Sequence, residues 1–371
     1  MGIIVSLPNP GGSGKDLQLE FGKMVTNQIE TIVSHLPAEW YAQSGVQLTW
    51  PHTGTDWAYM LEEVQQCFID IACEIARREI LLIVTPEPEV VKSQIASIVN
   101  MENVRFVQCE TNDTWARDHG AITMIDEGTP SLLDFTFNGW GLKFASDCDN
   151  RITRRLIEVG VLKGRYVNRL GFVLEGGSIE SDGMGTLLTT SECLLSPNRN
   201  GQMNQVEIEE YLRSTFHLQK VLWLDHGYLA GDDTDSHIDT LARFCSPDTI
   251  AYVKCEDHED EHYEELSAME EQLKSFRNSA GQPYRLLALP MADKIEIDGE
   301  RLPATYANFL IINGAVLYPT YNQVENDRRA KEVLQEAFPK HEIIGIDCRP
   351  LIKQHGSLHC VTMQYPVGVL K

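Results

Sequence analysis

A faint internal repeat is the feature that most constrains how this chain can fold. Each copy consists of a turn, a short β-rich run, a second turn and a second β-rich run, followed by a helical stretch. Five copies occur, and their first residues are 70, 61, 61 and 71 positions apart: Gly45, Trp115, Gly176, His237 and Asn308. Self-similarity of this regularity indicates radial or solenoid repetition of one supersecondary unit.

Helical patterns lie between the β-rich parts of the repeats. Apolar residues recur at three- and four-residue steps in residues 57–77, 149–161, 204–215, 259–276 and 324–337. The continuous apolar run 81–84 predicts a buried strand instead. We therefore predict a single α/β domain over residues 36–371. Residues 1–35 are predicted to form a partly flexible leader, rich in Pro, Gly and Ser, followed by a helix.

Charge and hydropathy exclude several kinds of partner. The 371 residues carry a formal net charge of -23, whereas phosphate contacts need clustered Lys and Arg, so neither nucleic acid nor a membrane surface is expected as a partner. The sequence shows no membrane-spanning run and no signal peptide, which predicts a cytoplasmic protein. The acidic balance would attract a small cationic substrate, although it also serves solubility alone. A homo-oligomer is compatible with the sequence.

The cysteines predict neither a disulfide framework nor a metal site. All nine are scattered singly, without a C-x-x-C pair. Most are expected to be small buried hydrophobes. Because no metal-ligand spacing stands out elsewhere, we expect neither a metal ion nor a cofactor.

Two segments place polar side chains where a strand is expected to begin. His237 and Asp239 flank Ile238, and in an extended segment the imidazole and the carboxylate would face the same side. A strand end whose polar groups meet water is the alternative. Trp115 and Asp118 occupy a second such position, where a salt bridge between Asp118 and Arg117 would be the simpler interpretation.

Cys360 lies where the last β-rich run begins. A lone cysteine is usually a core residue, so this position by itself predicts little. His359 is adjacent, but neighbouring strand residues face opposite sides, which makes His237 the better general base.

The segments gain meaning together, because a radial repeat brings equivalent ends of different units to one axis. We expect a funnel lined by Trp115, Asp118, His237, Asp239 and Cys360. Two carboxylates can bind a planar guanidinium through paired charge-assisted hydrogen bonds and orient its carbon toward a thiolate. This combination predicts amidine hydrolysis.

Six motifs in a fixed order support this interpretation. They are residues 37–40 with 49–52, 115–118, 174–177, 235–239, 308–314 and 358–360. In these motifs the chain resembles the agmatine deiminase and bacterial peptidylarginine deiminase group of the guanidino-modifying, or pentein, superfamily. The resemblance implies a five-bladed, pseudo-symmetric α/β propeller with a central active-site channel.

The resemblance also implies a role for each matched residue. Cys360 would be the nucleophile, His237 the general acid and base, and Asp118 and Asp239 the ligands of the guanidinium nitrogens. The implied substrate contacts are Trp115 over the guanidinium plane, Asp233 at the distal ammonium, Glu175 with Gly176 and Gly177 around the channel, and Gly356 opposite Trp115.

Agmatine is the predicted substrate, hydrolysed to N-carbamoylputrescine and ammonia through a covalent thiouronium intermediate. The chain departs from the family pattern in three places: Gln354 and His355 precede Gly356 where glycines are usual, Asp233 replaces Glu, and Ser236 replaces Gly. Free arginine or peptidyl arginine is therefore the alternative substrate. Two other hypotheses for the function are a cysteine peptidase or amidase that uses Cys360 and His237, and a catalytically silent binding protein.

Overall fold

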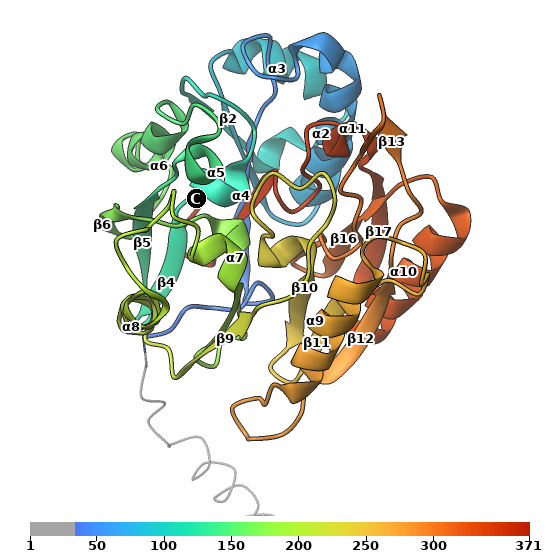
Figure 1. The fold of residues 1–371 in the computed structure, drawn as a ribbon. Helices are drawn as coiled ribbons and strands as arrows, with labels where there is room; N and C mark the ends of the chain where they lie inside the picture. Colours follow the sequence, from blue (N-terminus) through green and yellow to red (C-terminus); the bar gives the residue numbers. More distant parts are fainter. Residues whose placement is uncertain (1–33) are drawn as a thin grey trace, which may run out of the picture. The chain divides into compact units, whose positions relative to one another are not determined.

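Five small β-sheets share one connection pattern in this computed structural model, which describes residues 34–371 (Figure 1). In each sheet an antiparallel strand pair is followed by a parallel strand, and a helix lies between the two parallel strands in the sequence. Four sheets are three-stranded: β4 (Ile122–Asp126), β5 (Thr129–Thr136) and β6 (Arg165–Val173); β7 (Ile179–Ser181), β8 (Thr186–Thr190) and β9 (Lys220–Leu224); β10 (Ala242–Ser246), β11 (Thr249–Lys254) and β12 (Arg285–Pro290); β15 (Leu310–Ile312), β16 (Ala315–Thr320) and β17 (Glu342–Asp347).

The fifth sheet joins the two ends of the described chain. Its order is β18 (Thr362–Pro366), β1 (Gln43–Thr49), β2 (Ile80–Thr85) and β3 (Val104–Gln108). The last strand, β18, pairs antiparallel with the first strand, β1, so that Thr362 lies opposite Leu48. The sheet is therefore completed only when the C-terminal segment returns to the N-terminal one. A further two-stranded sheet pairs β13 (Glu296–Ile297) with β14 (Glu300–Arg301).

The helices predicted from apolar periodicity are confirmed within a few residues at each end. They are α2 (Leu61–Ala76), α6 (Asp149–Glu158), α8 (Gln205–Phe216), α9 (Tyr263–Ser275) and α10 (Val324–Ala337). The predicted buried strand 81–84 is β2. The remaining helices and 3-10 turns are short: η1 (Ala58–Met60), α3 (Pro88–Ile95), η2 (Met101–Asn103), α4 (Ala116–His119), α5 (Gly139–Leu142), η3 (Gly176–Ser178), α7 (Ser191–Leu194), η4 (Ile238–Thr240) and α11 (Arg349–Ile352). Most of them are too short to show a helical period.

Helix α2 illustrates how the sequence pattern becomes packing. Val64, Phe68, Ile71 and Ile75 recur at helical spacing and are fully buried. Burying one such side chain contributes roughly 1.5–3 kcal/mol relative to leaving it in water. The stripe thus fixes which face of α2 lies on the core.

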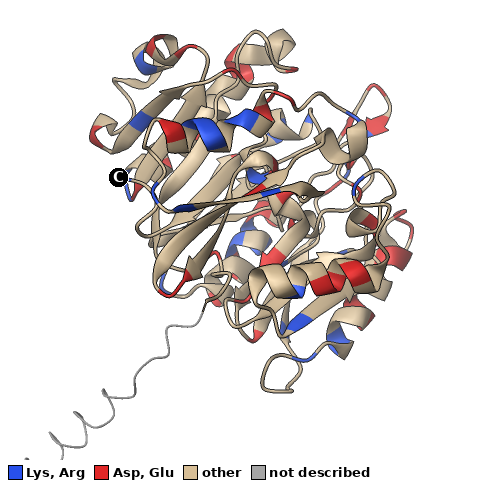
Figure 2. Ribbon diagram, turned by 90° about the vertical axis from the view of Figure 1, so that its left-hand side faces the viewer, with Lys and Arg blue, Asp and Glu red and all other residues tan. Residues whose placement is uncertain are grey.

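Residues 34–371 form one compact unit. The predicted leader and helix before residue 34 lie outside the described residues. In the described part, no helix is long and apolar enough to cross a membrane. Figure 2 shows Lys and Arg interspersed with Asp and Glu over helices and loops of the face in view.

Candidate active site

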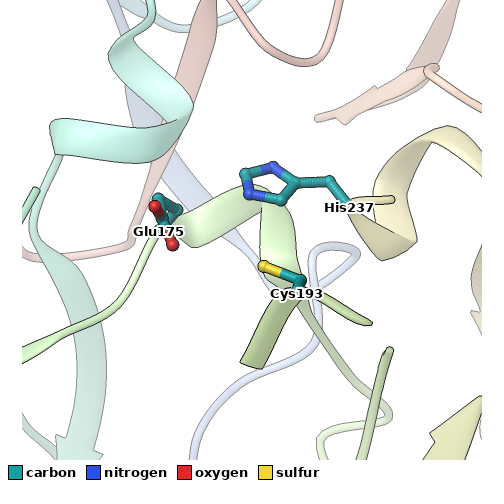
Figure 3. Close-up of side chains that lie close together, drawn as sticks. All are labelled: Glu175, Cys193 and His237. Atoms are coloured by element: carbon teal, nitrogen blue, oxygen red, sulfur yellow. The ribbon is translucent and has the colours of Figure 1, made fainter. Parts of the chain in front are cut away.

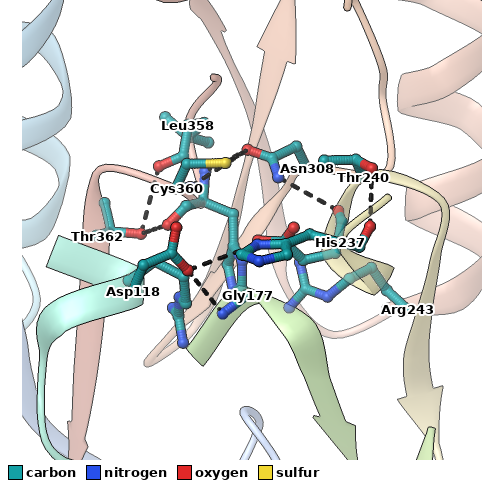
Figure 4. A network of polar contacts seen from close by, with 12 residues as sticks. Asp118, Gly177, His237, Thr240, Arg243, Asn308, Leu358, Cys360 and Thr362 are labelled. Carbon is teal, nitrogen blue, oxygen red and sulfur yellow. Dashed lines mark hydrogen bonds and ion pairs between the residues drawn. The ribbon is translucent and has the colours of Figure 1, made fainter. Parts of the chain in front are cut away.

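The turn that precedes each antiparallel strand pair contributes to one group of buried side chains (Figure 4). The contributions are Asp118 from α4 before β4, Gly177 from η3 before β7, His237 and Asp239 at η4 before β10, Asn308 before β15, and Cys360 before β18. The repeat thus brings residues that are far apart in the sequence into one group.

The local conformations differ from the extended segments expected from the sequence. His237 precedes a 3-10 turn and Asp239 lies within it, because the backbone N–H and the hydroxyl of Thr240 both donate to the carbonyl of His237, at 3.2 and 2.8 Å. Asp118 lies in the single-turn helix α4, closed by its own N–H donating to the Trp115 carbonyl at 3.0 Å. The extended conformation predicted for these two segments is therefore wrong, although their side chains still lie close together.

A hydrogen-bonded loop fixes the approach to His237. The carboxylate of Asp232 accepts hydrogen bonds from the Thr234 hydroxyl at 2.6 Å and from the Ser236 N–H at 2.8 Å. The Thr234 hydroxyl in turn accepts from the N–H of His237 at 3.1 Å. Ser236 has a φ of 61°, a left-handed conformation that glycine adopts more easily, so this loop carries local strain.

Asn308 holds the predicted nucleophile. Its side-chain oxygen accepts from the backbone N–H of His359 at 2.8 Å, from the N–H of Cys360 at 3.3 Å and from the Cys360 thiol at 3.4 Å. Its amide nitrogen donates to the carbonyl of Asp239 at 3.3 Å. One buried side chain thus ties the Cys360 turn to the η4 turn, a link that sequence analysis missed.

The two predicted carboxylates are bound differently. Asp118 uses both oxygens, accepting from the N–H of Gly177 and from the indole N–H of Trp140, each at 2.9 Å. Asp239 lies 2.7 Å from a ring nitrogen of His359 through Oδ2, while its Oδ1 has no hydrogen-bond partner among the described residues. Asp239 therefore keeps a free acceptor.

His237 is fully buried, and its Nδ1 lies 3.6 Å from Asp118 Oδ1, beyond hydrogen-bond distance. Neither ring nitrogen has a hydrogen-bond partner within residues 34–371. Burial lowers the pKa of His237 to about 3, more than the nearby charge of Asp239 raises it. The imidazole is consequently neutral at neutral pH and is able to accept a proton.

Burial also keeps Cys360 protonated in the empty site. Desolvation, followed by the charges of Asp239 and Asp118, raises the pKa of the thiol well above its ordinary value. Desolvation and the charges of Asp239 and Glu175 likewise raise the pKa of Asp118. Because His237 is neutral, it supplies no positive charge to a thiolate; that charge has to come from a bound cation.

Cys360 and Asp118 line one cavity. The other lining residues are Asp56, Asp113, Trp115, Trp140, Phe144, Asp233, Thr234, Gln354, His355 and Gly356. Gly356 lies against Trp115, since an added Cβ would be 2.0 Å from the indole ring. His237 and Asp239 are fully buried and are not among the lining residues. Of the five residues expected to line a funnel, Trp115, Asp118 and Cys360 thus line this cavity.

Glu175 and Gly176 lie away from the lining of that cavity. Glu175 is fully buried and accepts hydrogen bonds from Arg199 Nε with both oxygens at 3.0 Å. Its carboxylate also lies near Cys193 and His237, and their potential ligand atoms are within 4.8 Å of one another (Figure 3). Because Arg199 already neutralises Glu175, this group is explained by an ion pair and needs no metal. An added Cβ at Gly176 would meet the carbonyl of Arg117 at 2.2 Å.

Comparison with known proteins identifies the family. The model of the Porphyromonas-type peptidyl-arginine deiminase family matches residues 35–366. The chain belongs to this family. Among curated relatives, the agmatine deiminase of Ectopseudomonas mendocina is 32% identical over 356 residues, covering 90% of this chain and 95% of the relative.

Two solved structures extend this family likeness. A Porphyromonas gingivalis protein provisionally named an arginine deiminase is 54% identical with a TM-score of 0.87, covering 91% of this chain and 100% of that one. The C. jejuni agmatine deiminase with substrate bound is 39% identical with a TM-score of 0.84, covering 91% and 98%. The mixed α/β fold of several small sheets therefore matches that of family deiminases.

Proposed function

We propose that this protein is an agmatine deiminase, which hydrolyses the guanidinium group of agmatine to N-carbamoylputrescine and ammonia. The observation that carries the proposal is the composition of the cavity that holds Cys360. Four carboxylates line it, Asp56, Asp113, Asp118 and Asp233, and none of the described lining residues is Lys or Arg. A thiol in such a cavity is suited to an electrophile that is itself a cation.

In the first half of the proposed reaction, the sulfur of Cys360 forms a bond to the guanidinium carbon. The neutral imidazole of His237 accepts the thiol proton and then donates it to the departing nitrogen. The C–N bond breaks, ammonia leaves, and a thiouronium remains on Cys360. Asp118 and Asp239 hold the substrate nitrogens, and Trp115 covers the guanidinium plane.

In the second half, His237 accepts a proton from water, and the resulting hydroxide attacks the thiouronium carbon. The C–S bond breaks, the thiolate of Cys360 takes the proton back from His237, the hydroxyl group formed from water loses its proton to solvent as the C=O bond forms, and the neutral ureido product leaves. Protons balance, because His237 is neutral at the beginning and at the end of each half-reaction and the positive charge of the substrate leaves as one proton, which ammonia takes up in water.

The substrate cation would activate its own nucleophile. Burial, together with the charges of Asp239 and Asp118, raises the pKa of the Cys360 thiol. A guanidinium bound to the two carboxylates offsets their charge and adds a positive one beside the sulfur, which favours the thiolate. Reactivity would therefore depend on occupancy by a cation.

Arginine or peptidyl arginine is the second candidate substrate. The family description and the provisional name of the Porphyromonas gingivalis structure favour it. The α-carboxylate of free arginine, however, would enter a cavity lined by four Asp side chains, with no Lys or Arg among the described lining residues to pair with it. The distal ammonium of agmatine would instead pair with Asp233 at the mouth, whose side chain is 42% exposed.

We further propose the closed arrangement that this function needs. Five sheets of one pattern and the pairing of β18 with β1 support a five-bladed ring with the site at its axis. A leader over residues 1–35, a single deiminase domain over 36–371 and a cytoplasmic location remain predictions.

The test is to measure release of ammonia and of ureido product from agmatine, free arginine and an arginyl peptide. We expect agmatine to give the highest kcat/KM, and Asp233→Asn to lower it for agmatine more than for arginine. Preference for arginine or the peptide would overturn the substrate assignment. Cleavage of a peptide or amide bond without ureido product would mean a cysteine peptidase or amidase instead.

A further inference from the structure

His359 lies between two buried carboxylates. Its Nδ1 is 2.7 Å from Asp239 Oδ2, and its Nε2 is 2.6 Å from Glu39 Oε2. The side chain of His359 is 2% exposed. A ring nitrogen bonds a carboxylate oxygen only when a proton lies between them, so two such contacts require two protons on this ring or one on a carboxylate.

The surrounding charges favour the doubly protonated ring. Three carboxylates, Glu39, Glu180 and Asp239, share this interior with only two guanidinium groups. Arg243 donates to Glu180 and, at 2.9 Å, to Glu39, while Arg117 Nη2 lies 3.6 Å from Glu39. A neutral His359 would leave one buried carboxylate without a counter-charge, which is costly, whereas an imidazolium balances the group.

His359 acts from behind the reaction cavity. With Glu39, Glu180 and Arg117 it lines a cavity separate from the one lined by Cys360 and Asp118. Its contact with Asp239 uses only Oδ2, so Oδ1 remains without a partner among the described residues although it is buried. A buried acceptor of this kind is available to a substrate N–H.

We propose that His359 is a positioning residue whose permanent positive charge keeps Asp239 ionised and turns its free oxygen toward the guanidinium. The proposal rests on the deiminase function above, since it assigns Asp239 to the substrate. The carboxylates of Asp118 and Asp239 approach one point, since a Cβ added at Gly177 would lie 2.8 Å from Asp118 Oδ1 and 3.1 Å from Asp239 Oδ2, and loss of the imidazolium would favour protonation of Asp239 beside this second acid. A protonated Asp239 no longer offers the charge that a desolvated guanidinium requires.

The kinetic test uses His359→Gln, which removes the positive charge of the ring but keeps a hydrogen-bond donor. We expect kcat/KM for agmatine at pH 7 to fall at least tenfold, mainly through KM, and the acid limb of the kcat/KM profile to move up by at least one pH unit. The charged groups that face this position are Glu39, Asp239 and Glu180 with Arg243 and Arg117. Glu39 keeps its contact with Arg243 at 2.9 Å in the variant, so the loss of the imidazolium falls mainly on Asp239.

A matched control is His262→Gln. His262 is also buried and lies 2.7 Å from a carboxylate, that of Asp260, but it lies outside the lining of the cavity that holds Cys360. The control should leave both kinetic parameters and the acid limb unchanged. If His359→Gln lowers the melting temperature and kcat without moving the acid limb, His359 is only structural and the proposal is overturned.

A second measurement does not depend on turnover or on folding of the variant. In wild-type protein with 15N-labelled histidine rings, we expect one of the 11 histidines to keep imidazolium shifts at pH 8.5. If every histidine is neutral there, the permanent charge is refuted. If wild-type protein shows the imidazolium but turns over no guanidine, the deiminase function fails while the charge assignment stands.

Discussion

Gly177 offers the sharpest test of the site geometry, because a single methyl group there would contact three predicted site residues. A Cβ added at Gly177 would lie 2.7 Å from His237 Nδ1, 2.8 Å from Asp118 Oδ1 and 3.1 Å from Asp239 Oδ2. Ordinary contacts of a Cβ begin near 3.4 Å, so His237 has to shift by roughly 0.7 Å or the backbone has to move. Since a misplacement of about 1 Å can cost roughly 100-fold in rate, we expect Gly177→Ala to lower kcat/KM by about 100-fold, or about 2.7 kcal/mol.

The assay compares ammonia release from agmatine with thermal unfolding of the same variant. Overpacking typically costs about 1–3 kcal/mol of stability, so Gly177→Ala should still fold. Gly171→Ala in β6 is the control, since nothing lies within 4 Å of an added Cβ there. If Gly177→Ala is folded and retains activity within about threefold of wild type, His237, Asp118 and Asp239 do not act together on the substrate.

Three other predictions follow from burial and charge. Cys360→Ser should abolish ammonia release with an unchanged circular dichroism spectrum, whereas Cys245→Ser should retain it; equal loss in both would make Cys360 structural. Asp118→Asn should raise KM and lower kcat/KM for agmatine at least tenfold, because the variant removes the negative charge that the substrate cation would contact and disturbs the hydrogen bonds from Gly177 and Trp140. Unchanged kinetics would show that Asp118 is not part of the site. Burial raises the pKa of Glu79 to about 7, so its contribution to stability is present at acidic pH and is lost as pH rises from about 4.5 through about 7. Glu79→Gln should therefore stabilise the protein at pH 8 relative to wild type but not at pH 4, as urea titrations at the two pH values would show, and an equal effect at both would refute this reasoning.

The convergence of the site could be predicted because it follows from the repeat and not from local geometry. Asp118, His237 and Cys360 occupy equivalent positions before their strand pairs. If the repeat units are arranged around a common axis, equivalent positions of different units lie close to one another. The local conformation could not be predicted in this way. The turn at His237 depends on the hydroxyl of Thr240, and apolar periodicity carries no information about such a hydrogen bond.

The supporting residues were harder to find, because their partners are distant in the sequence. Glu39 and His359 are 320 positions apart, and Asn308 and Cys360 are 52 apart. Glu39 and Asn308 fall within motifs that match the family, but a motif does not say which neighbour a side chain will bind. Only the folded arrangement reveals that Asn308 holds the thiol and that His359 lies between Glu39 and Asp239.

The charge states of His237 and Asp239 also affect how the product of the proposed reaction would be released. His237 is neutral because of burial, whereas the pKa of Asp239 lies below its ordinary value: burial alone would raise it, but His359 and Arg243 more than offset that effect. The site therefore presents negative charge that a guanidinium complements. In the proposed reaction, hydrolysis would convert that cation into a neutral ureido group, which would remove the main attraction at the reacting end while the acids remain desolvated. The same unpaired charge that favours substrate binding thus disfavours retention of the product.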